Sequence, residues 1–532
     1  MSPLHRTPGL KSEPSLSRNA AFNVGGLLIY LAIAFFLSPF VIHHLGNARY
    51  GAWSLAADLM GYYTLLDFGI RWAVGFFVAR YSARDERDRL QSCIASGFWG
   101  SAAIGFVLAL LGIGLSFAFP HIFTKGEVSA REVVPALCVL SATIGLGFPM
   151  EVFSFVIGGS RRQDLINVTE VTTRLLGAAG MYFVLKAGGG LLSVSLVQCG
   201  GRVLCWSWNY VWAQRVAGPF SLRPSGFRFA DLRALAGLGS VNIVIALADL
   251  VISRTDLIVI GAFLGVKWVA FYNIGRLLVD YGSQLNGNIT QAFTPHFMHL
   301  IAREELAAVR RLYLLGARIS GLLSIPLAAC MFAFGHSFLR LWVGPAYVTG
   351  PLGERSDVVM SVLLLALLPR WQQSISWQVM LASGKYRILM FQNLAVAIAN
   401  ILLSLTLVRH YGMIGVASAR AVTSIITNLT WTPALVLHRF QVPWRDYLRE
   451  GLARPVLLGL IMSGFSTALV GICLPVSWKL LFAEAALTVL VYAALCWTIG
   501  LTREDRRLAR QRLDSLLCRF RPPARRSDAT GA

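Results

Sequence analysis

Residues 254–276 read RTDLIVIGAFLGVKWVAFYNIGR, and this stretch decides the fold. Two apolar, helix-length segments meet at Leu264-Gly265, and each carries an arginine, Arg254 or Arg276. An arginine at the centre of a membrane-spanning helix costs at least about 2.5–3.5 kcal/mol. It is tolerated where it faces a cavity, a partner or a ligand. The stretch therefore predicts a membrane protein with a polar interior.

The composition of the whole chain agrees with a membrane protein. The 532 residues are 56% hydrophobic and 14% charged, whereas a soluble domain carries about 25% charged residues. Apolar runs of about 20 residues recur along the chain, and no cleavable signal peptide is expected at its start. We predict an all-α polytopic fold with about fourteen transmembrane helices, at 20–42, 51–78, 93–118, 133–157, 166–185, 190–212, 234–263, 269–297, 312–334, 357–382, 388–408, 413–437, 456–475 and 480–500.

The basic residues predict the orientation of these spans. With the N-terminus placed inside, Lys and Arg concentrate in the inside segments and are sparse in the outside ones. The positive-inside rule then places both termini in the cytoplasm and favours an even number of spans. The same bias accounts for the net charge of +22, so no nucleic-acid partner is expected. The eight cysteines are scattered and indicate no metal site.

An internal repeat appears when the chain is shifted by 219 residues. Leu45-Gly46 falls on Leu264-Gly265, and Arg84-Asp85-Glu86 falls on Arg303-Glu304-Glu305. Two six-helix lobes related by a repeat are typical of transporters whose cargo site lies between the lobes. The predicted division is a cytoplasmic tail at 1–19, an N-lobe of spans 1–6 at 20–216, a linker at 217–233, a C-lobe of spans 7–12 at 234–437, a linker at 438–455, two extra spans at 456–500 and a basic tail at 501–532.

Seven arginines lie inside predicted spans: Arg71, Arg174, Arg202, Arg254, Arg276, Arg370 and Arg420. Three of them have an acid four residues away, which places both charges on one helix face; the pairs are Asp67/Arg71, Glu170/Arg174 and Arg276/Asp280. We expect the pair in the more polar span 5, Glu170/Arg174, to be a structural neutralisation. Arg202 and Arg420 have no acid at helical spacing and stay unassigned.

The arginines other than Arg174, Arg202 and Arg420 form the candidate cargo site. A guanidinium binds a phosphate oxygen pair with two hydrogen bonds and keeps its charge at any relevant pH. The predicted substrate-binding residues are Arg71, Arg254, Arg276 and Arg370. Arg370 follows Pro369, which should free backbone carbonyls in span 10. The predicted ion-coupling or charge-pair residues are Asp58, Asp67, Asp249, Asp256 and Asp280. A coupling proton or sodium ion is left open, and no other cofactor is expected.

Several motifs in order resemble the polysaccharide repeat-unit flippases of the multidrug/oligosaccharidyl-lipid/polysaccharide exporter superfamily. They run from about residue 20 to 437 and are Asn23-Val24-Gly25, Leu45-Gly46, Tyr50-Gly51-Ala52-Trp53, Leu66-Asp67-Phe68-Gly69, Arg254 to Gly261, Phe271-Tyr272-Asn273, Leu341-Trp342-Val343-Gly344 and Gly412 to Val416. The resemblance implies translocation of a lipid-linked oligosaccharide on an undecaprenyl pyrophosphate carrier across the bacterial inner membrane, for surface polysaccharide or exopolysaccharide. It carries over Asp67, Arg254 and Asp256 as motif positions, whereas Arg71, Arg276 and Arg370 rest on the topology. Polymerases and glycosyltransferases of the same pathway are expected partners.

Two other functions fit the sequence less well. A cation-coupled multidrug antiporter of the same fold would want acids in both lobes, but span 1 has none and the membrane arginines repel cations. An enzyme of the same pathway would need a large outer loop carrying catalytic groups, and no such loop is predicted. The sequence also lacks a phosphate-binding loop of the GxxxxGK[ST] type. The flippase is therefore the preferred interpretation, and the chain is not expected to be an enzyme.

Overall fold

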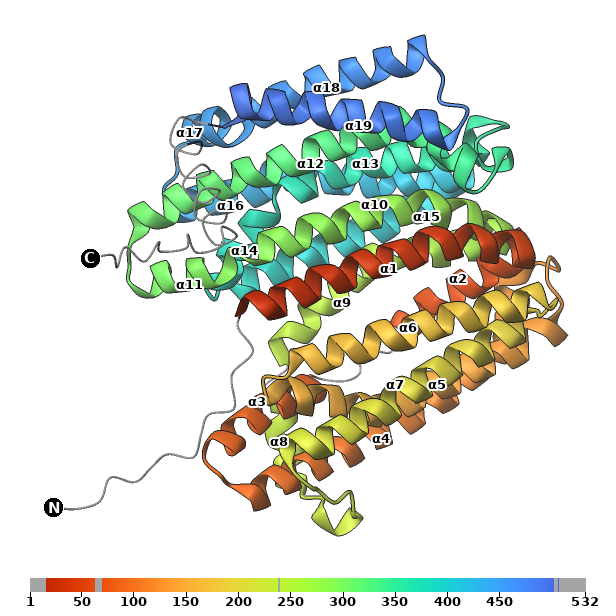
Figure 1. The fold of residues 1–532 in the computed structure, drawn as a ribbon, viewed down its shortest axis with the longest axis vertical. Coiled ribbons are helices and arrows are strands. Elements are labelled where there is room, and N and C mark those ends of the chain that lie inside the picture. The colour runs from red at the N-terminus through yellow and green to blue at the C-terminus, as the bar shows by residue number, and fades with distance from the viewer. Residues whose placement is uncertain (1–15, 63–68, 238–239, 502–505, 507–532) are drawn as a thin grey trace, which may run out of the picture. The chain divides into compact units, whose positions relative to one another are not determined.

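The computed structural model describes residues 16–62, 69–237, 240–501 and 506, and these form helices joined by short turns, with no strand among them (Figure 1). The α-helices are α1 (Leu16–Leu45), α2 (Asn47–Gly61), α3 (Ile70–Ala83), α4 (Arg87–Phe119), α5 (Ala130–Gly159), α6 (Gln163–Lys186), α7 (Leu191–Ala217), α8 (Phe229–Gly237), α9 (Ser240–Leu264), α10 (Val266–Gln291), α11 (Thr294–Ala302), α12 (Leu306–Trp342), α13 (Ser356–Gln372), α14 (Ser374–Ala382), α15 (Tyr386–Ile426), α16 (Thr432–Arg439), α17 (Trp444–Asp446), α18 (Ala453–Ile472) and α19 (Trp478–Leu495).

The predicted all-α membrane fold is confirmed. Among the described residues, seven helices are long and apolar enough to cross a membrane: Arg87–Thr124, Ala130–Gly159, Leu306–Trp342, Ser356–Ala382, Arg387–Arg439, Trp444–Ile472 and Trp478–Gly500. The count of fourteen spans stays a prediction. Residues 1–15 of the predicted N-terminal tail and most of the basic C-terminal tail lie outside the described residues, and α1 begins at Leu16, four residues before the start of the first predicted span.

The repeat is visible in where helices begin and end. At a shift of 219 residues, the end of α1 matches the end of α9, and the start of α2 matches the start of α10. The ends of α3 and α11 and the starts of α4 and α12 correspond in the same way. The turns match too, because Gly46 and Gly265 both have positive φ (76° and 104°), as do Asp85 and Glu304 (55° and 59°). The two copies therefore share their turn geometry.

Three predicted spans are interrupted in the described part of the chain, one of them the span predicted at 357–382, which breaks between α13 and α14. The span predicted at 51–78 is not one helix, since α2 ends at Gly61 and α3 begins at Ile70 after Gly69, whose φ of 70° is left-handed. The span predicted at 269–297 ends its first helix at Gln291 and resumes at Thr294. The range labelled α15 covers two predicted spans and consists of two helices that meet at a kink at Gly412 (φ 58°, ψ −139°), where the backbone is not helical and where the sequence predicts the break.

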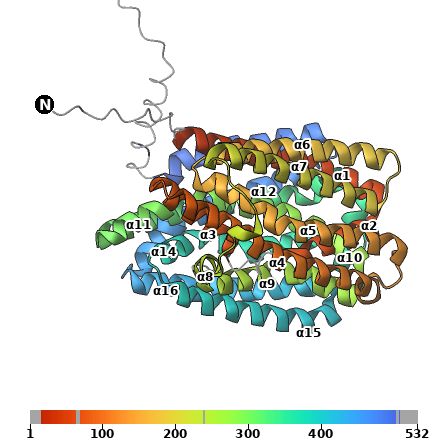
Figure 2. The same ribbon diagram turned by 90° about the horizontal axis from the view of Figure 1, so that it is seen from below.

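The chain divides into two compact units. Unit 1 comprises residues 1–281, 342–363 and 385–423, and unit 2 comprises 282–341, 364–384 and 424–532. In unit 1, α5 packs against α3, α4 and α7, and α6 packs against α1 and α7 (Figures 1 and 2). One core of unit 1 joins α3, α4 and α5 through buried side chains such as Val74, Ile94 and Phe153. The predicted division into N-lobe and C-lobe stays a prediction.

In unit 2, the end of α13 is held by side chains. The carbonyl oxygen of Trp371 accepts hydrogen bonds from Asn286 Nδ2 (3.0 Å) and Ser320 Oγ (2.8 Å). The helix runs through Pro369 and ends at Gln372, so the interruption comes three residues later than Pro369 itself. Because backbone carbonyls in a membrane interior must find donors, these two side chains make the break between α13 and α14 tolerable.

Candidate functional site

Asp58 is the centre of the candidate site in unit 1. It lies on α2 with its side chain 6% exposed, and both of its oxygens are used. Oδ1 accepts a hydrogen bond from Arg254 Nη1 on α9, and Oδ2 accepts one from Arg276 Nη1 on α10, each at 2.7 Å. One carboxylate therefore faces two guanidinium groups from the second repeat. A buried carboxylate is stable only with such compensation.

Arg276 is held in place by further contacts. Its Nη2 donates to Asn273 Oδ1 (2.9 Å), and its Nη1 also donates to the carbonyl oxygen of Ser253 (3.2 Å). Its Nε lies 3.6 Å from Asp280 Oδ2, which confirms the predicted i,i+4 pair. Asn273 also donates to Tyr50 and Ser54 of α2. Arg276 is thus fixed by several partners and its side chain is only 11% exposed.

Arg254 is the more accessible of the two arginines. Its side chain is 38% exposed, and its guanidinium lies against the backbone of Gly61. A Cβ atom added at Gly61 would stand 2.9 Å from Arg254 Nε and Cζ, which is closer than real Cβ contacts allow. The absence of a side chain at Gly61 thus leaves room for the arginine. We call Asp58, Arg254, Arg276 and Asp280 the Asp58 cluster.

A second pair in unit 1 is fully enclosed. Arg420 on α15 donates from Nη1 to Asp256 Oδ2 at 3.1 Å, and Tyr272 donates its hydroxyl to the same oxygen at 2.7 Å. The side chains of Arg420 and Asp256 are 5% and 0% exposed. The sequence left Arg420 without a partner, because the acid lies on another helix. Burial on both sides makes this pair a structural one rather than a cargo contact.

The other predicted residues are Arg71, Asp67, Asp249 and Arg370. Arg71 on α3 is buried and pairs with Glu151 of α5, and its guanidinium stands 4.8 Å from the centre of the Phe148 ring. Asp67, its predicted partner, lies outside the described residues. Asp249 is half-buried on α9. Arg370 is half-buried on α13 of unit 2.

Sequence reasoning missed Glu151 and assigned Arg174 correctly. Glu151 is an acid inside the apolar stretch of α5, and that unusual position was the available signal. Arg174 pairs with Glu170 at 2.6 Å on the same helix, and both side chains are well exposed. Arg202 is exposed on α7. No group of three or more His, Cys, Asp or Glu residues that could hold a metal occurs in the described part of the chain.

The two repeats also meet where a tight turn of the first repeat contacts the turn between α9 and α10. Lys125 and Gly126 have left-handed φ angles of 45° and 83°. This turn directs Lys125 Nζ to the carbonyl oxygen of Phe263 at the end of α9, and Glu127 Oε2 to the backbone N–H of Lys267 at the start of α10 (2.7 Å). A cation at a helix C-terminus and an anion at an N-terminus both suit the helix dipole. We call these two contacts the 125–127 clamp.

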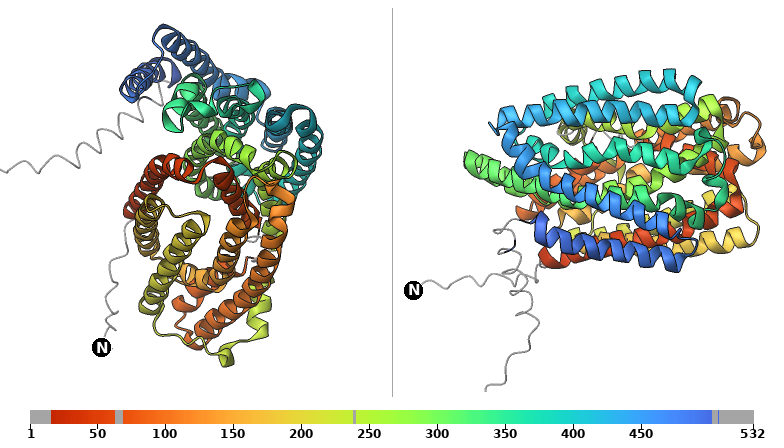
Figure 3. Two further views of the ribbon diagram at one scale, coloured as in Figure 1. Left: turned by 90° about the vertical axis from the view of Figure 1, so that its right-hand side faces the viewer. Right: turned by 90° about the horizontal axis from the view of Figure 1, so that it is seen from above.

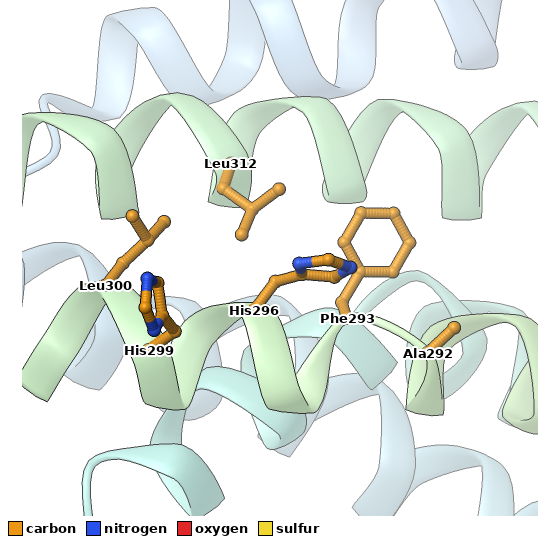
Figure 4. A pocket seen from close by; sticks show the side chains of 6 residues that line it. All are labelled: Ala292, Phe293, His296, His299, Leu300 and Leu312. Carbon is orange, nitrogen blue, oxygen red and sulfur yellow. The ribbon is translucent and has the colours of Figure 1, made fainter. Parts of the chain in front are cut away.

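Unit 2 contains a cavity of different character between α11 and α12, with a volume of about 410 Å³ (Figure 4). Its walls are apolar except for two imidazole rings, and Leu312 of α12 points across toward His296 of α11. The lining residues are Ala292, Phe293, His296, His299, Leu300 and Leu312. None of the predicted cargo residues lines it, so it is not part of the candidate site.

Comparisons with known proteins agree on one class. Residues 85–349 match the family described as "Polysaccharide biosynthesis protein". The chain is 20% identical over 504 residues to the "Uncharacterized membrane protein EpsK" of Bacillus subtilis, covering 93% of this chain and 97% of that one. It is 22% identical over 432 residues to the "Probable flippase AglR" of Haloferax volcanii, covering 79% and 83%. A third relative is the "Putative O-antigen transporter" of Shigella flexneri, at 19% identity, covering 78% and 96%.

Solved structures show the same fold. The lipid II flippase MurJ in an inward closed conformation has a TM-score of 0.66 at 15% identity, covering 90% of this chain and 97% of that one. An inward-facing multidrug transporter of the MATE family has a TM-score of 0.62 at 14% identity, covering 78% and 96%. At such identities the likeness concerns the fold alone. The matched family and these neighbours are biosynthesis proteins, flippases and transporters, not enzymes.

Proposed function

Because this chain belongs to the polysaccharide repeat-unit flippases of the multidrug/oligosaccharidyl-lipid/polysaccharide exporter superfamily, we propose that its cargo is an oligosaccharide on an undecaprenyl pyrophosphate carrier. The protein is a multi-pass membrane flippase of lipid-linked oligosaccharide and not an enzyme. It carries its cargo from the inner to the outer leaflet of the bacterial inner membrane, for surface polysaccharide or exopolysaccharide.

The shared carboxylate of Asp58 is the observation that carries the proposed mechanism. Two guanidinium groups converge on one carboxylate, and Arg254 is open enough to reach an incoming anion. A pyrophosphate group offers more acceptor oxygens than a carboxylate and more negative charge. The cargo head group displaces Asp58 from Arg254 first, while Arg276 stays anchored by Asn273 and Ser253. Arg71 and Arg370 are proposed contacts of the same anion elsewhere along its path.

Alternating access fits the placement of the 125–127 clamp. The predicted topology puts Lys125 and Lys267 on the outer side of the membrane. The clamp holds the turn between α9 and α10 to a turn of the first repeat. Breaking it is the proposed step that opens the outer end and releases cargo there. The same topology supports the proposed inner-membrane location with both termini in the cytoplasm.

We propose Asp280 as the site of a coupling proton or sodium ion. Its side chain is 38% exposed, the largest exposure among the acids of the Asp58 cluster, and its nearest arginine atom is 3.6 Å away. Cation binding there would weaken the hold of Asp280 on Arg276 and favour the cargo-bound state. Polymerases and glycosyltransferases of the same pathway are the proposed partners, because they would supply and consume the flipped unit.

A multidrug antiporter is the second candidate, and it is less well supported. Its cationic cargo would need a carboxylate without an arginine beside it, but Asp58 is held by two arginines, Asp280 is paired with one of these arginines, and Asp256 is held by Arg420 and Tyr272. The structural likeness to a MATE transporter concerns the fold alone. An anionic head group therefore suits the Asp58 cluster better than a cationic drug.

A leaflet assay tests the proposed function. In a strain lacking the gene, lipid-linked repeat units should accumulate on the cytoplasmic face of the inner membrane. Wild-type protein should restore their transfer, and Arg254→Ala should not, whereas Arg254→Lys should restore part of it because a charge is kept. Arg174→Ala is the matched control, since that exposed arginine is neutralised within its own helix. Normal surface polysaccharide in the deletion strain would refute the proposal.

A further inference from the structure

The hairpin of α18 and α19 packs closely on α12 within unit 2 (Figures 1 and 3). A Cβ atom added at Gly459 of α18 would stand 2.0 Å from the Ile325 side chain. The rings of Phe338 and Trp478 lie 5.7 Å apart and perpendicular. The hydroxyl of Tyr492 donates to the carbonyl oxygen of Leu322. These contacts show that α19 runs antiparallel to α12. Both the start and the end of α19 contact α12.

The Tyr492 contact has a specific cause. Pro326 lies inside α12 and has no N–H, so the carbonyl of Leu322, four residues earlier, loses its normal helical partner. A carbonyl without a donor in the membrane interior is costly. Tyr492 supplies the missing donor from the hairpin. The hairpin therefore stabilises α12 at its proline.

The same face of α19 carries a carboxylic acid. Leu481, Glu484 and Thr488 are its buried positions, and Tyr492 continues the same stripe one turn later. Glu484 is 5% exposed, and neither of its carboxyl oxygens has a hydrogen-bond partner among the described residues. The hydroxyl of Thr488, one turn away, is likewise buried without a partner. A carboxylate in this place would carry a buried charge without compensation, which is strongly unfavourable.

Among the described residues of the neighbouring helices, no cationic side chain compensates Glu484. Helix α18 has no ionisable residue after Arg454 in its first turn. The stretch of α12 between Leu322 and Phe338 carries only Cys330 and His336, and His336 is exposed. On α19 itself, Lys479 is exposed near the start of the helix, and Cys496 follows its last residue. With a single acid present, a proton is a better-suited ligand than a metal ion.

We propose that Glu484 is a proton-binding site that makes the attachment of the α18–α19 hairpin to α12 depend on pH. One proton from bulk water adds to the carboxylate, and the neutral acid fits the dry contact with α12. Loss of the proton leaves a charge that needs water, which separates α19 from α12 and takes Tyr492 away from Leu322. The proposal does not rest on the cargo of the flippase.

Infrared spectroscopy of the full-length protein in lipid nanodiscs tests the proton directly. The C=O stretch of a protonated carboxylic acid should be present near neutral pH and lost in Glu484→Gln. Glu170→Gln is the matched control and should leave that band unchanged, because Glu170 is an exposed partner of Arg174. Persistence of the full band in Glu484→Gln, or its absence from the wild type, would overturn the proposal.

A crosslinking experiment tests the coupling to the hairpin. In a background without native cysteines, Phe338→Cys and Trp478→Cys place two thiols across the contact between α12 and α19. At fixed exposure to a pH-independent bifunctional reagent, the crosslinked fraction should fall as the pH rises, and Glu484→Gln should remove this dependence. Glu484→Asp keeps a titratable carboxyl group and should therefore keep the pH dependence of crosslinking. This second variant keeps the test informative if Glu484→Gln fails to fold. An identical pH profile in wild type and Glu484→Gln would refute the coupling.

Discussion

At the residue scale, the Asp58 cluster shows which charge pairs a sequence can predict. Arg276/Asp280 and Arg174/Glu170 were predictable, because the i,i+4 spacing of one helix fixes their distance. The pairs of Asp58 with Arg254 and Arg276 were not, since they depend on how α2 docks against α9 and α10. The pair of Arg71 with Glu151 could not be predicted either, because the two residues lie on different helices. Residue types were visible in the sequence, whereas partners on other helices needed the structure.

Neutralising one charged residue of the Asp58 cluster should lower the free energy of unfolding more than neutralising two oppositely charged ones together. Arg276→Gln leaves Asp58 Oδ2 without its cationic donor in a buried place, so we expect a loss of about 3–5 kcal/mol of stability. Adding Asp58→Asn should recover part of it, with a coupling of about 0.5–3 kcal/mol. Thermal unfolding of the purified single and double variants measures both. Arg174→Gln should cost at most about 1 kcal/mol, because that pair is exposed. Strictly additive losses in the cycle would argue against the shared carboxylate.

The enclosed pair of Asp256 and Arg420 should behave differently in transport. The double variant Asp256→Asn/Arg420→Gln removes both charges together and keeps an acceptor for the Tyr272 hydroxyl. We expect it to stay folded and to transport, because neutralising both members leaves no buried charge unpaired. The equivalent variant of the pair that contains the accessible Arg254, Asp58→Asn/Arg254→Gln, should stop transport. The leaflet assay compares the two, and loss of transport in both, with normal amounts of folded protein, would place Arg420 in the cargo path.

At the element scale, the repeat predicted the turns better than the helices between them. The shared positive φ of Gly46 and Gly265 explains why Leu-Gly marks the same turn in both copies. The copies then diverge, because α2 ends at Gly61 whereas α10 continues to Gln291. Gly61 and Gly69 were visible as helix-weakening residues in an apolar run. The helix break between these two glycines was not predicted, because an apolar run by itself does not show where a helix ends.

Close packing of α2 against the turn between α9 and α10 depends on Gly51. A Cβ atom added there would stand 1.8 Å from the carbonyl oxygen of Val266, so the backbone itself would have to move. We expect Gly51→Ala to lower the thermal unfolding temperature and to weaken transport by displacing Asp58 from its arginines. Gly114→Ala in α4 is the matched control, because open space surrounds that position and alanine favours a helix by about 0.5–1 kcal/mol. Equal stability of the two variants would contradict the close approach.

At the scale of the whole molecule, composition and basic-residue bias were enough to predict a helical membrane protein, and ordered motifs predicted its family. The number of spans is harder, since α9 carries three charged residues, Asp249, Arg254 and Asp256, within an otherwise apolar helix. Charges that serve a site weaken the hydropathy signal of the helices that carry it. Sequence patterns therefore reveal the class of protein more readily than the exact count of its spans.

The chemistry of the cargo can be tested on the intact flippase. A diphosphate head group can engage Arg254 and Arg276 together, whereas a monophosphate presents fewer oxygens and less charge to the same pair. In vesicles containing the purified protein, we therefore expect a prenyl diphosphate-linked sugar to cross faster than its monophosphate analogue. Arg254→Ala should reduce that preference as well as the rate, because only Arg276 then remains on Asp58. Asp256→Asn/Arg420→Gln is the control and should keep the preference for the diphosphate-linked sugar. Equal transport rates for the two lipids in vesicles with wild-type protein would show that the Asp58 cluster does not distinguish a diphosphate head group from a monophosphate.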